Sequence, residues 1–351
     1  MSKNIMIYGA NGYTGELIAE YAIERGLKPI LAGRNKPEIE TLAKKLELDS
    51  RVFSLDFALN IENALKDIDI VIHCAGPFSA TAEPMMNACI ATKTHYTDIT
   101  GEIAIFEMAQ DKNLLAQEAG VVLCPGVGFD VIPTDCLASQ LKDKLPDATH
   151  LQLGFDSGSG LSPGTAKTSV EGLGDGGKIR KDGHIIQVPL AHKCQTIDFG
   201  NGEKNAMTIP WGDVSTAYYS TGIPNIEVYI PISPKGASNI RKMNWFRWLF
   251  KLNFVQKQMK KKAAATSLGP NKEQRAKLRT FVWGKVTNAN GDSVTGKIET
   301  CNGYELTYLG AVEVAQFLLS NDVNGGAFTP SKLINNQLVH QLAGVKETVF
   351  S

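Results

Sequence analysis

The sequence IMIYGANGYTG occupies residues 5–15 and joins two different periodicities. Residues 5–8 are apolar and predict a buried strand, and residues 13–25 have the spacing of a helix that Gly26 ends. Gly9, Gly12 and Gly15 follow the strand and open the helix, at intervals that permit a tight turn, close approach of a ligand to the backbone, and close helix packing. Because the first N–H groups of a helix lack intrahelical partners, this turn predicts a phosphate-binding site.

The first half of the chain alternates strand-like and helical segments. Further strands are predicted at residues 29–32, 51–55, 68–74, 94–97 and 121–124, with helical patterns between them. Strands joined by helical crossovers form a parallel sheet with helices on both faces. The sequence therefore predicts an α/β fold in which residues 1–145 form a doubly wound parallel sheet, a Rossmann-type dinucleotide-binding domain.

After residue 145, strand-like segments follow one another without helices between them. They cover residues 149–155, 184–188, 206–209 and 226–230, and Asn290-Gly291 lies in a predicted hairpin turn between strands at 281–287 and 293–300. This pattern predicts a second, α+β domain at residues 146–309 with a mostly antiparallel sheet. A helix is expected at 310–319, and residues 310–351 are expected to pack back on the first domain.

The composition excludes several classes of protein. Lysine and arginine total 36 and so do aspartate and glutamate, so no overall field attracts nucleic acid, and no nucleic-acid partner is expected. The six cysteines form no CxxC pair, so neither a disulfide framework nor a metal site is expected. The first apolar segment is too short for a secretion signal, and no apolar stretch approaches the roughly 20 residues of a membrane span. We therefore expect a cytoplasmic chain.

The end of the second predicted strand distinguishes between two cofactors. NAD-binding domains usually carry a carboxylate about 20 residues after the glycine turn, where it accepts a hydrogen bond from the ribose 2′-hydroxyl. Here Arg34 can pair with the 2′-phosphate of NADP, and Asn35 can donate to it. NADP(H) is therefore the favoured cofactor and NAD(H) the alternative, while a solvated loop role for Arg34 stays open. Asp56, after the third strand, is a candidate contact to adenine or an ordinary helix N-cap.

Polar, glycine-containing loops follow the fourth, fifth and sixth strands. Because the carboxyl ends of parallel strands face the ligand crevice, we expect these loops to lie beside the cofactor's pyrophosphate and nicotinamide ribose. The residues expected to bind the cofactor are Gly9, Asn11, Gly12, Tyr13, Thr14, Gly15, Arg34, Asn35, Asp56, Ala75, Gly76, Pro77, Gly101 and Gly126.

The ordered set of motifs resembles the saccharopine dehydrogenase-like NAD(P)-binding superfamily, in the branch that includes trans-acting enoyl reductases and saccharopine dehydrogenase-like oxidoreductases. The resemblance rests on GANGYTG, AGRN, CAGPF, HYTDITGE and PGVGFDVIPTD, and more loosely on LSPGTAKTS and GYELT. It implies a Rossmann domain followed by a substrate and dimerisation domain, hydride transfer from NADPH, and a homodimer. It supplies neither a substrate nor a catalytic dyad.

The charges of the second half of the chain bear on the substrate. A saccharopine-like substrate carries several carboxylates, which arginines normally hold by bidentate hydrogen bonds. Residues 136–351 contain only five arginines, and two of them lie in one aromatic and basic stretch. A saccharopine-type imine reductase is therefore disfavoured, and an NAD(P)H-dependent oxidoreductase acting on an unsaturated or carbonyl, even lipid-like, substrate fits better.

Hydride transfer also needs an acid that supplies a proton, and the candidates are Tyr96, Glu102 and Lys167. Each has an ordinary alternative role: Tyr96 as a strand residue with its hydroxyl at the surface, Glu102 as a residue stabilised at a helix start, and Lys167 as a solvated side chain. A non-catalytic dinucleotide-binding protein, acting as a redox sensor or membrane-associated scaffold, therefore stays open beside the reductase.

Residues 241–262, the aromatic-basic segment, contain eight Lys or Arg and no Asp or Glu. On one helix, Trp245, Trp248, Leu249, Leu252, Val255 and Met259 would share a face. Basic residues beside a Trp-rich face suit a helix that lies in an anionic lipid interface, which predicts a peripheral membrane contact. Packing on the chain's own domain or on a dimer mate is an equal alternative.

Overall fold

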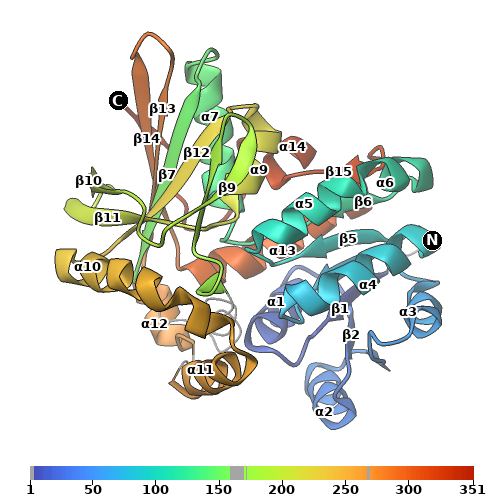
Figure 1. The fold of residues 1–351 in the computed structure, drawn as a ribbon. Coiled ribbons are helices and arrows are strands. Elements are labelled where there is room, and N and C mark those ends of the chain that lie inside the picture. Colours follow the sequence, from blue (N-terminus) through green and yellow to red (C-terminus); the bar gives the residue numbers. More distant parts are fainter. Residues whose placement is uncertain (1–3, 159–169, 171, 267–268) are drawn as a thin grey trace. The chain divides into compact units, whose positions relative to one another are not determined.

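The computed structural model describes residues 4–158, 170, 172–266 and 269–351, and the chain divides into two compact units (Figure 1). The first unit contains Met1–Ile132 and Tyr304–Asn335, and the second contains Pro133–Gly303 and Asn336–Ser351. The predicted boundary at residue 145 differs from this division, because helix α7 (Ile132–Lys144) packs Leu137 and Leu141 against glycines of the second unit's sheet. The last sixteen residues also group with the second unit rather than the first.

The first unit is built on a seven-stranded sheet in the order β15-β6-β5-β4-β1-β2-β3, with every pairing parallel. This is the predicted doubly wound topology, which is confirmed. Its elements are β1 (Ile5–Tyr8), α1 (Tyr13–Glu24), β2 (Ile30–Gly33), α2 (Lys36–Leu46), β3 (Ser50–Val52), α3 (Ala58–Leu65), β4 (Ile70–His73), α4 (Phe78–Thr92), β5 (His95–Asp98), α5 (Ile103–Asp111), α6 (Asn113–Ala119), β6 (Val122–Cys124), α13 (Gly303–Ser320), β15 (Gly326–Ala327) and α14 (Pro330–Leu333).

The central strands β1 and β4 are buried along their whole length because both faces of the sheet are covered. Alternate residues such as Met6, Val71 and Leu123 point to one face, where they form a buried core with side chains of α3, α4, α5 and α6. Helix α13 reaches back to α1 through the ring contact of Tyr21 with Tyr308. The two-residue strand β15 was not predicted.

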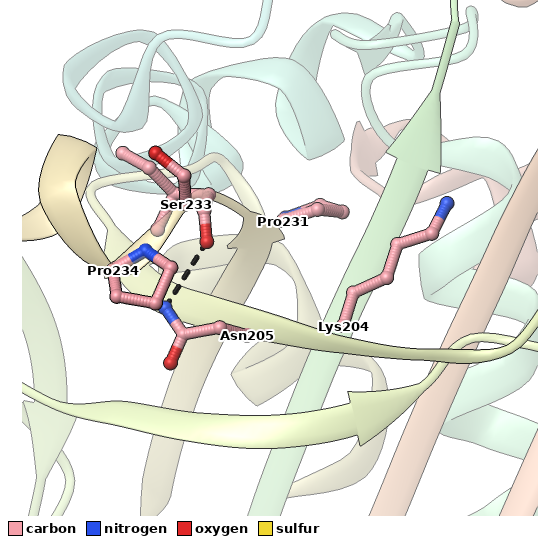
Figure 2. A pocket seen from close by; sticks show the side chains of 6 residues that line it. Lys204, Asn205, Pro231, Ser233 and Pro234 are labelled. Atoms are coloured by element: carbon pink, nitrogen blue, oxygen red, sulfur yellow. Dashed lines mark hydrogen bonds between the residues drawn. The ribbon is translucent and has the colours of Figure 1, made fainter.

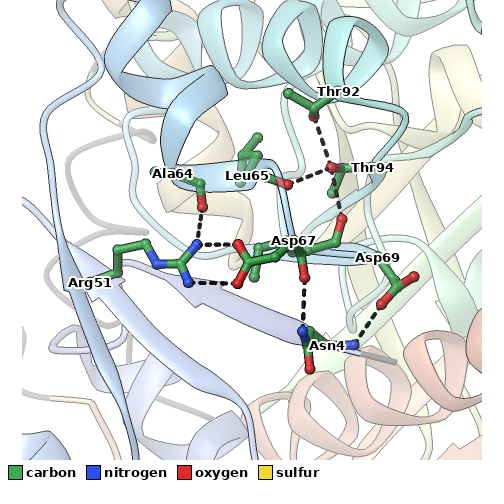
Figure 3. A network of polar contacts seen from close by, with 9 residues as sticks. Asn4, Arg51, Ala64, Leu65, Asp67, Asp69, Thr92 and Thr94 are labelled. Atoms are coloured by element: carbon green, nitrogen blue, oxygen red, sulfur yellow. Dashed lines mark hydrogen bonds and ion pairs between the residues drawn. The ribbon is translucent and has the colours of Figure 1, made fainter. Parts of the chain in front are cut away.

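A polar network fixes the edge of this sheet where the strands begin (Figure 3). Arg51 and Asp67 form two parallel hydrogen bonds of 2.7 and 3.0 Å, and Arg51 holds the pKa of the Asp67 carboxyl below its usual range. Asn4 donates its side-chain amide to the carbonyl of Asp67 and its backbone N–H to Asp69. These contacts join the starts of β1 and β4 to the end of α3. The glycine turn lies at the opposite, carboxyl ends of the strands.

The second unit is built on a mixed sheet in the order β10-β11-β12-β7-β13-β14-β16, to which β8 and β9 are added beside β12. Only the pair of β7 with β12 is parallel among its described pairings, so the predicted, mostly antiparallel α+β domain is confirmed. The strands are β7 (His150–Ser157), β8 (Gly177–Lys181), β9 (His184–Val188), β10 (Cys194–Asp198), β11 (Glu203–Ile209), β12 (Asn225–Pro231), β13 (Thr280–Thr287), β14 (Ser293–Thr300) and β16 (Val349–Phe350).

Local chemistry accounts for the hairpin between β13 and β14. The side chain of Asn288 accepts hydrogen bonds from the N–H groups of Asn290 and Asp292, and Gly291 adopts a φ of +93°. Remaining helices of this unit are α9 (Asp213–Thr221), α10 (Pro234–Met243), the 3₁₀ helix η1 (Asn244–Lys251), α11 (Asn253–Thr266), α12 (Lys272–Lys277) and α15 (Leu338–Gln341).

The single amphipathic helix expected over the aromatic-basic segment is wrong. The backbone passes from α10 into η1, becomes extended at Leu252, and starts again as α11. Side-chain amides hold both junctions: Asn244 bonds the N–H and carbonyl of Leu190, and Gln256 donates to the carbonyl of Phe250. The predicted common face is consequently divided, with Trp245, Trp248 and Leu252 exposed and Leu249, Val255 and Met259 half-buried. No helix among the described residues is long and apolar enough to cross a bilayer.

Candidate cofactor and catalytic site

The glycine turn after β1 is held so tightly that two of its positions exclude any side chain. Gly9 has a φ of +83°, and a Cβ there would lie 2.7 Å from the backbone nitrogen of Ala75. A Cβ on Gly15 would lie 2.4 Å from the carbonyl oxygen of Gly9. The turn therefore packs against the loop after β4, and α1 begins directly over the end of β1.

The start of α1 fits a phosphate group. Its N-cap is Gly12, which has no side chain to bond the helix, and Tyr13 and Thr14 begin the first turn. The first N–H groups of a helix have no intrahelical acceptor and carry the positive end of the helix dipole. An anion placed at this turn would satisfy donors that the chain leaves without a capping side chain.

The predicted adenosine-side residues also lie together. Arg34 and Asp56 are exposed, Asn35 is half-buried at the start of α2, and the charges of Arg34 and Asp56 both act on the hydroxyl of Tyr8. Burial raises the pKa of Tyr8 to about 12, while Arg34 opposes and Asp56 adds to that shift. The ends of β1, β2 and β3 are thus brought together as the parallel sheet requires.

Glu38 is a residue of this site that the sequence prediction missed. It lies in the first turn of α2, and its carboxylate accepts a 2.6 Å hydrogen bond from the side chain of Asn11 in the glycine turn. Asn11 also lies over the end of β2, since a Cβ on Gly33 would be 3.2 Å from its side-chain oxygen. A carboxylate therefore lies beside the glycine turn, but it belongs to Glu38, several residues after the position where NAD-binding domains usually carry one.

Asp98 joins the loops after β5 and β6. Its buried carboxylate accepts hydrogen bonds of 2.9 Å from the N–H of Thr100, 2.8 Å from the N–H of Gly126 and 2.6 Å from the hydroxyl of Tyr96. Burial raises the pKa of Asp98 to about 6 against the opposing effect of these donors. These bonds fix the backbone beside Gly101, so the loops that were expected to converge do so within this unit.

Two predicted proton donors have structural partners in the first unit. Tyr96 is fully buried rather than at the surface, and burial raises the pKa of its hydroxyl, which donates to Asp98. Glu102 accepts hydrogen bonds of 3.1 and 3.0 Å from the N–H groups of Phe78 and Ser79, and so caps α4 after Pro77 and the exposed Gly76. The third candidate, Lys167, lies outside the described residues.

Asp130, in the loop after β6, is a titratable group that the sequence prediction did not single out. The residue is half-buried, and its carboxylate fills the space beside Gly101, where a Cβ would lie 3.0 Å from an oxygen of Asp130. Burial raises the pKa of Asp130 to about 7. A carboxyl group that titrates near neutrality at the carboxyl edge of the sheet can hold and release a proton there.

His73, unlike Asp130, cannot take up and release a proton near neutral pH. It is buried under the loop after β4, where its Nε2 lies 3.0 Å from the hydroxyl of Thr81. Burial lowers the pKa of His73 to about 3, so its ring stays neutral.

The second unit holds a shallow groove of about 440 Å³ beside the start of α10 (Figure 2). Lys204, Asn205, Pro231, Ile232, Ser233 and Pro234 line it. Asn205 donates a 3.0 Å hydrogen bond to the carbonyl of Ile232, so the amide braces the wall of the groove. Over the described ranges no group of three or more His, Cys, Asp or Glu side chains is arranged to hold a metal ion.

The arginines of the second unit are each engaged locally. Arg180 donates to the carbonyls of Val214 and Gly183 and stacks on the ring of Tyr218 at 4.2 Å. Arg241, Arg275 and Arg279 donate to neighbouring backbone carbonyls, and Arg247 packs over Gly176. These contacts give no support to a pocket built to hold several carboxylates.

Comparisons with known proteins agree with this arrangement. Residues 5–124 match the family model described as saccharopine dehydrogenase NADP binding domain. A saccharopine dehydrogenase-like oxidoreductase of Homo sapiens is 23% identical over 99% of this chain and 97% of its own length. A trans-acting enoyl reductase of Mycobacterium tuberculosis is 29% identical over 39% of this chain and 35% of its own length.

A solved structure shares the fold. Apo saccharopine dehydrogenase (L-Glu forming) from Saccharomyces cerevisiae matches with a TM-score of 0.67 at 11% identity, covering 100% of both chains. Together these findings confirm the resemblance read from the motifs. Residues 5–124 thus match an NADP-binding domain of the saccharopine dehydrogenase type, and the chain resembles the saccharopine dehydrogenase-like oxidoreductases over nearly its whole length.

Proposed function

We propose that this chain is an NADPH-dependent oxidoreductase that reduces an unsaturated or carbonyl group of a weakly charged, lipid-like substrate. The observation that carries the proposal is the uncapped start of α1 at the glycine turn, with Arg34 at the end of the neighbouring strand β2. Reductases that use NADP need both parts: donors for the pyrophosphate and a cation for the 2′-phosphate.

Each part of the first unit has a defined task in this proposal. The N–H groups in the first turn of α1 bind the pyrophosphate, Arg34 pairs with the 2′-phosphate, and the backbone at Ala75–Pro77 shapes the wall beside the nicotinamide ribose. When bound, the reduced nicotinamide supplies a hydride to the substrate carbon. The loops tied by Asp98 hold the opposite wall in place.

Asp130 is the proposed proton donor. Addition of a hydride to a C=C or C=O bond leaves negative charge on the neighbouring atom, and a neutral carboxyl group can neutralise it by giving up its proton. Asp130 is the half-buried carboxyl of the β6 loop whose pKa is raised to about 7, so about half of the molecules would carry the proton at neutral pH. Solvent returns the proton after product release.

The class of substrate follows from charge. A molecule with several carboxylates would need free guanidinium groups, whereas the arginines of the second unit bond backbone carbonyls or pack over their neighbours. The name of the enoyl reductase relative adds support for a conjugated double bond as the reduced group. A homodimer, implied by the resemblance, stays part of the proposal.

The test combines binding with turnover. NADPH and NADH are titrated by nicotinamide fluorescence, and NADPH oxidation is then followed with α,β-unsaturated acyl thioesters, long-chain ketones, and an imine formed from lysine and 2-oxoglutarate. Tighter binding of NADPH with turnover of the first or second class supports the proposal. Binding without turnover of any class supports the non-catalytic sensor or scaffold, and turnover of the imine alone would overturn the substrate assignment.

A further inference from the structure

Five large apolar side chains of the aromatic-basic segment are exposed within ten residues. They are Trp245, Phe246, Trp248, Leu252 and Phe254, with exposed fractions of 85, 59, 64, 40 and 66%. The other exposed large apolar residues of the described chain stand singly or in pairs. Single exposed apolar residues are ordinary on a protein surface, whereas a contiguous cluster indicates a binding surface.

The 3₁₀ geometry of η1 explains why this cluster faces outward. A 3₁₀ helix repeats every three residues, so side chains three apart lie in one row. The row of Trp245, Trp248 and Lys251 is exposed throughout, and the row of Asn244, Arg247 and Phe250 is half-buried. In an α-helix the two tryptophans would share a face but be offset by about 60° around the axis, whereas the period of three places them directly above one another.

The inward row anchors the surface to the second unit. Asn244 bonds both backbone groups of Leu190 at 2.8 and 3.1 Å, and Arg247 packs over Gly176. Gln256 ties the start of α11 to the carbonyl of Phe250 at 2.7 Å. Because these anchors do not use the tryptophan rings, the rings can be removed without loosening the backbone that presents them.

The charge of the segment is of one sign. It carries eight Lys or Arg and no Asp or Glu, and Lys242, Lys251, Lys257 and Lys261 are exposed. Of these four lysines, Lys251 forms an ion pair with Asp175 at 3.6 Å, in which both side chains are largely exposed. Apolar rings thus stand among cationic side chains that a partner of opposite charge can neutralise.

We propose that the outer face of η1 and α11 binds an anionic lipid surface, with Trp245, Phe246, Trp248 and Phe254 inserted at the headgroup level. Trp rings suit the boundary between headgroups and acyl chains, and lysine stems reach outward to the phosphates. A second copy of the chain fits this face less well. A two-fold contact would bring the same cationic surface against itself, whereas an anionic bilayer complements it. This inference stands independently of the proposed reductase activity.

The test uses the full chain and vesicles of phosphatidylcholine alone or with about 30% phosphatidylglycerol, a content that gives a strongly anionic surface. Co-sedimentation should occur with the anionic vesicles only and should weaken about tenfold as salt rises from roughly 0.05 to 0.5 M. Two of the four tryptophans, Trp245 and Trp248, are the exposed ones, so bound protein should show a blue shift of emission and quenching by brominated acyl chains.

Three double variants separate the contributions. Trp245→Ala with Trp248→Ala should reduce vesicle binding about tenfold or more, because the inserted apolar area is lost. Lys257→Glu with Lys261→Glu should reduce binding to anionic vesicles by a similar factor, because cationic attraction is reversed. The matched control is Leu114→Ala with Leu115→Ala, which removes exposed apolar side chains of α6 in the first unit and should leave vesicle binding unchanged.

Two outcomes would overturn the proposal. The first is absence of vesicle binding, or binding that the tryptophan variant retains in full. The second is a homodimer in analytical ultracentrifugation that the tryptophan variant converts to monomer, which would assign the face to a second copy. NADPH binding is measured for every variant, so that an unfolded protein is recognised and failure here is distinguished from failure of the proposed cofactor site.

Discussion

The carboxylate of Glu102 accepts a 3.1 Å hydrogen bond from the backbone N–H of Phe78, which joins the loop after β5 to the first turn of α4. A second bond, from Ser79, uses the other carboxylate oxygen. Both donors belong to the start of a helix whose N-cap, Pro77, offers no capping side chain. Glu102 therefore replaces the missing cap from a distant loop.

This role predicts the effect of Glu102→Gln. The amide keeps one acceptor but loses the negative charge, so the free energy of unfolding should fall by about 1 kcal/mol. The reductase rate should stay within about threefold of wild type, since a cap does not transfer the proton. Urea unfolding and steady-state rates check the two parts. A folded variant whose rate falls a hundredfold would make Glu102 the acid instead.

Replacing Arg34 tests the choice of cofactor. Arg34→Ala should raise the dissociation constant of NADPH about tenfold to a hundredfold and change that of NADH little, because only NADPH has a 2′-phosphate. Fluorescence titration with both cofactors measures the difference, and Arg34→Lys should recover part of it. Equal loss of both cofactors would show that Arg34 supports the loop rather than the phosphate.

Removing the charge of Glu38 should have the opposite effect on NADPH affinity from removing Arg34. Its carboxylate is bound to Asn11 beside the glycine turn, close to where a 2′-phosphate would add negative charge. Glu38→Gln keeps the side chain's size and removes its charge, so NADPH should bind about twofold to fivefold more tightly while NADH changes less. Titrations at low and physiological salt check this. A gain shared equally by the two cofactors would argue against repulsion of the 2′-phosphate.

Asp130→Asn should separate catalysis from cofactor binding. Loss of the proposed proton donor should lower kcat about a hundredfold with little change in NADPH affinity. The alkaline fall in the wild-type rate, expected near pH 7 from the raised pKa of Asp130, should disappear. Unchanged kcat, or an unchanged pH profile, would remove Asp130 from the mechanism.

Asp130→Asn should also change how the stability of the protein depends on pH. The folded-state pKa of Asp130 is raised from 3.8 to about 7, so the folded protein binds more protons than the unfolded chain between these values. Wild-type stability should therefore decline as pH rises from about 4 to 7 through this group. The Asn variant lacks that decline and should be more stable than wild type at pH 8, by on the order of 2 kcal/mol. Thermal unfolding across this pH range measures it.

Local patterns predicted the fold because they need no distant partner. The glycine turn, the strand that precedes it and the Asn290-Gly291 hairpin follow from short-range chemistry, and the structure has all three. The location of the Tyr96 hydroxyl, in contrast, did not follow from a local pattern. Alternation along a strand indicates which face a side chain takes, but in a parallel sheet both faces are buried, so the hydroxyl bonds Asp98 instead of reaching the surface.

The site residues that escaped prediction depend on contacts between distant segments. Asp130 gains its raised pKa from burial beside Gly101, and Glu38 reaches Asn11 across 27 positions of sequence. The aromatic-basic segment shows a related limit, because the spacing of its apolar residues is compatible with both the α-helical and the 3₁₀ repeat. Asn244 exchanges hydrogen bonds with the backbone of Leu190, and Gln256 donates to the carbonyl of Val170. These contacts with other segments, and not the segment's own pattern, decide that the helix breaks.

Strand β15 has a consequence for how the chain is made. It covers the outer edge of β6 through the pairs Gly326 with Val122 and Ala327 with Leu123, yet some two hundred residues separate the two strands. During synthesis, residues 1–132 leave the ribosome with β6 as an open edge, and they keep it until residues 133–303 of the second unit have been translated. The first unit is therefore completed only after most of the second unit has been made, so an N-terminal fragment expressed alone would retain an edge suited to pairing with other chains.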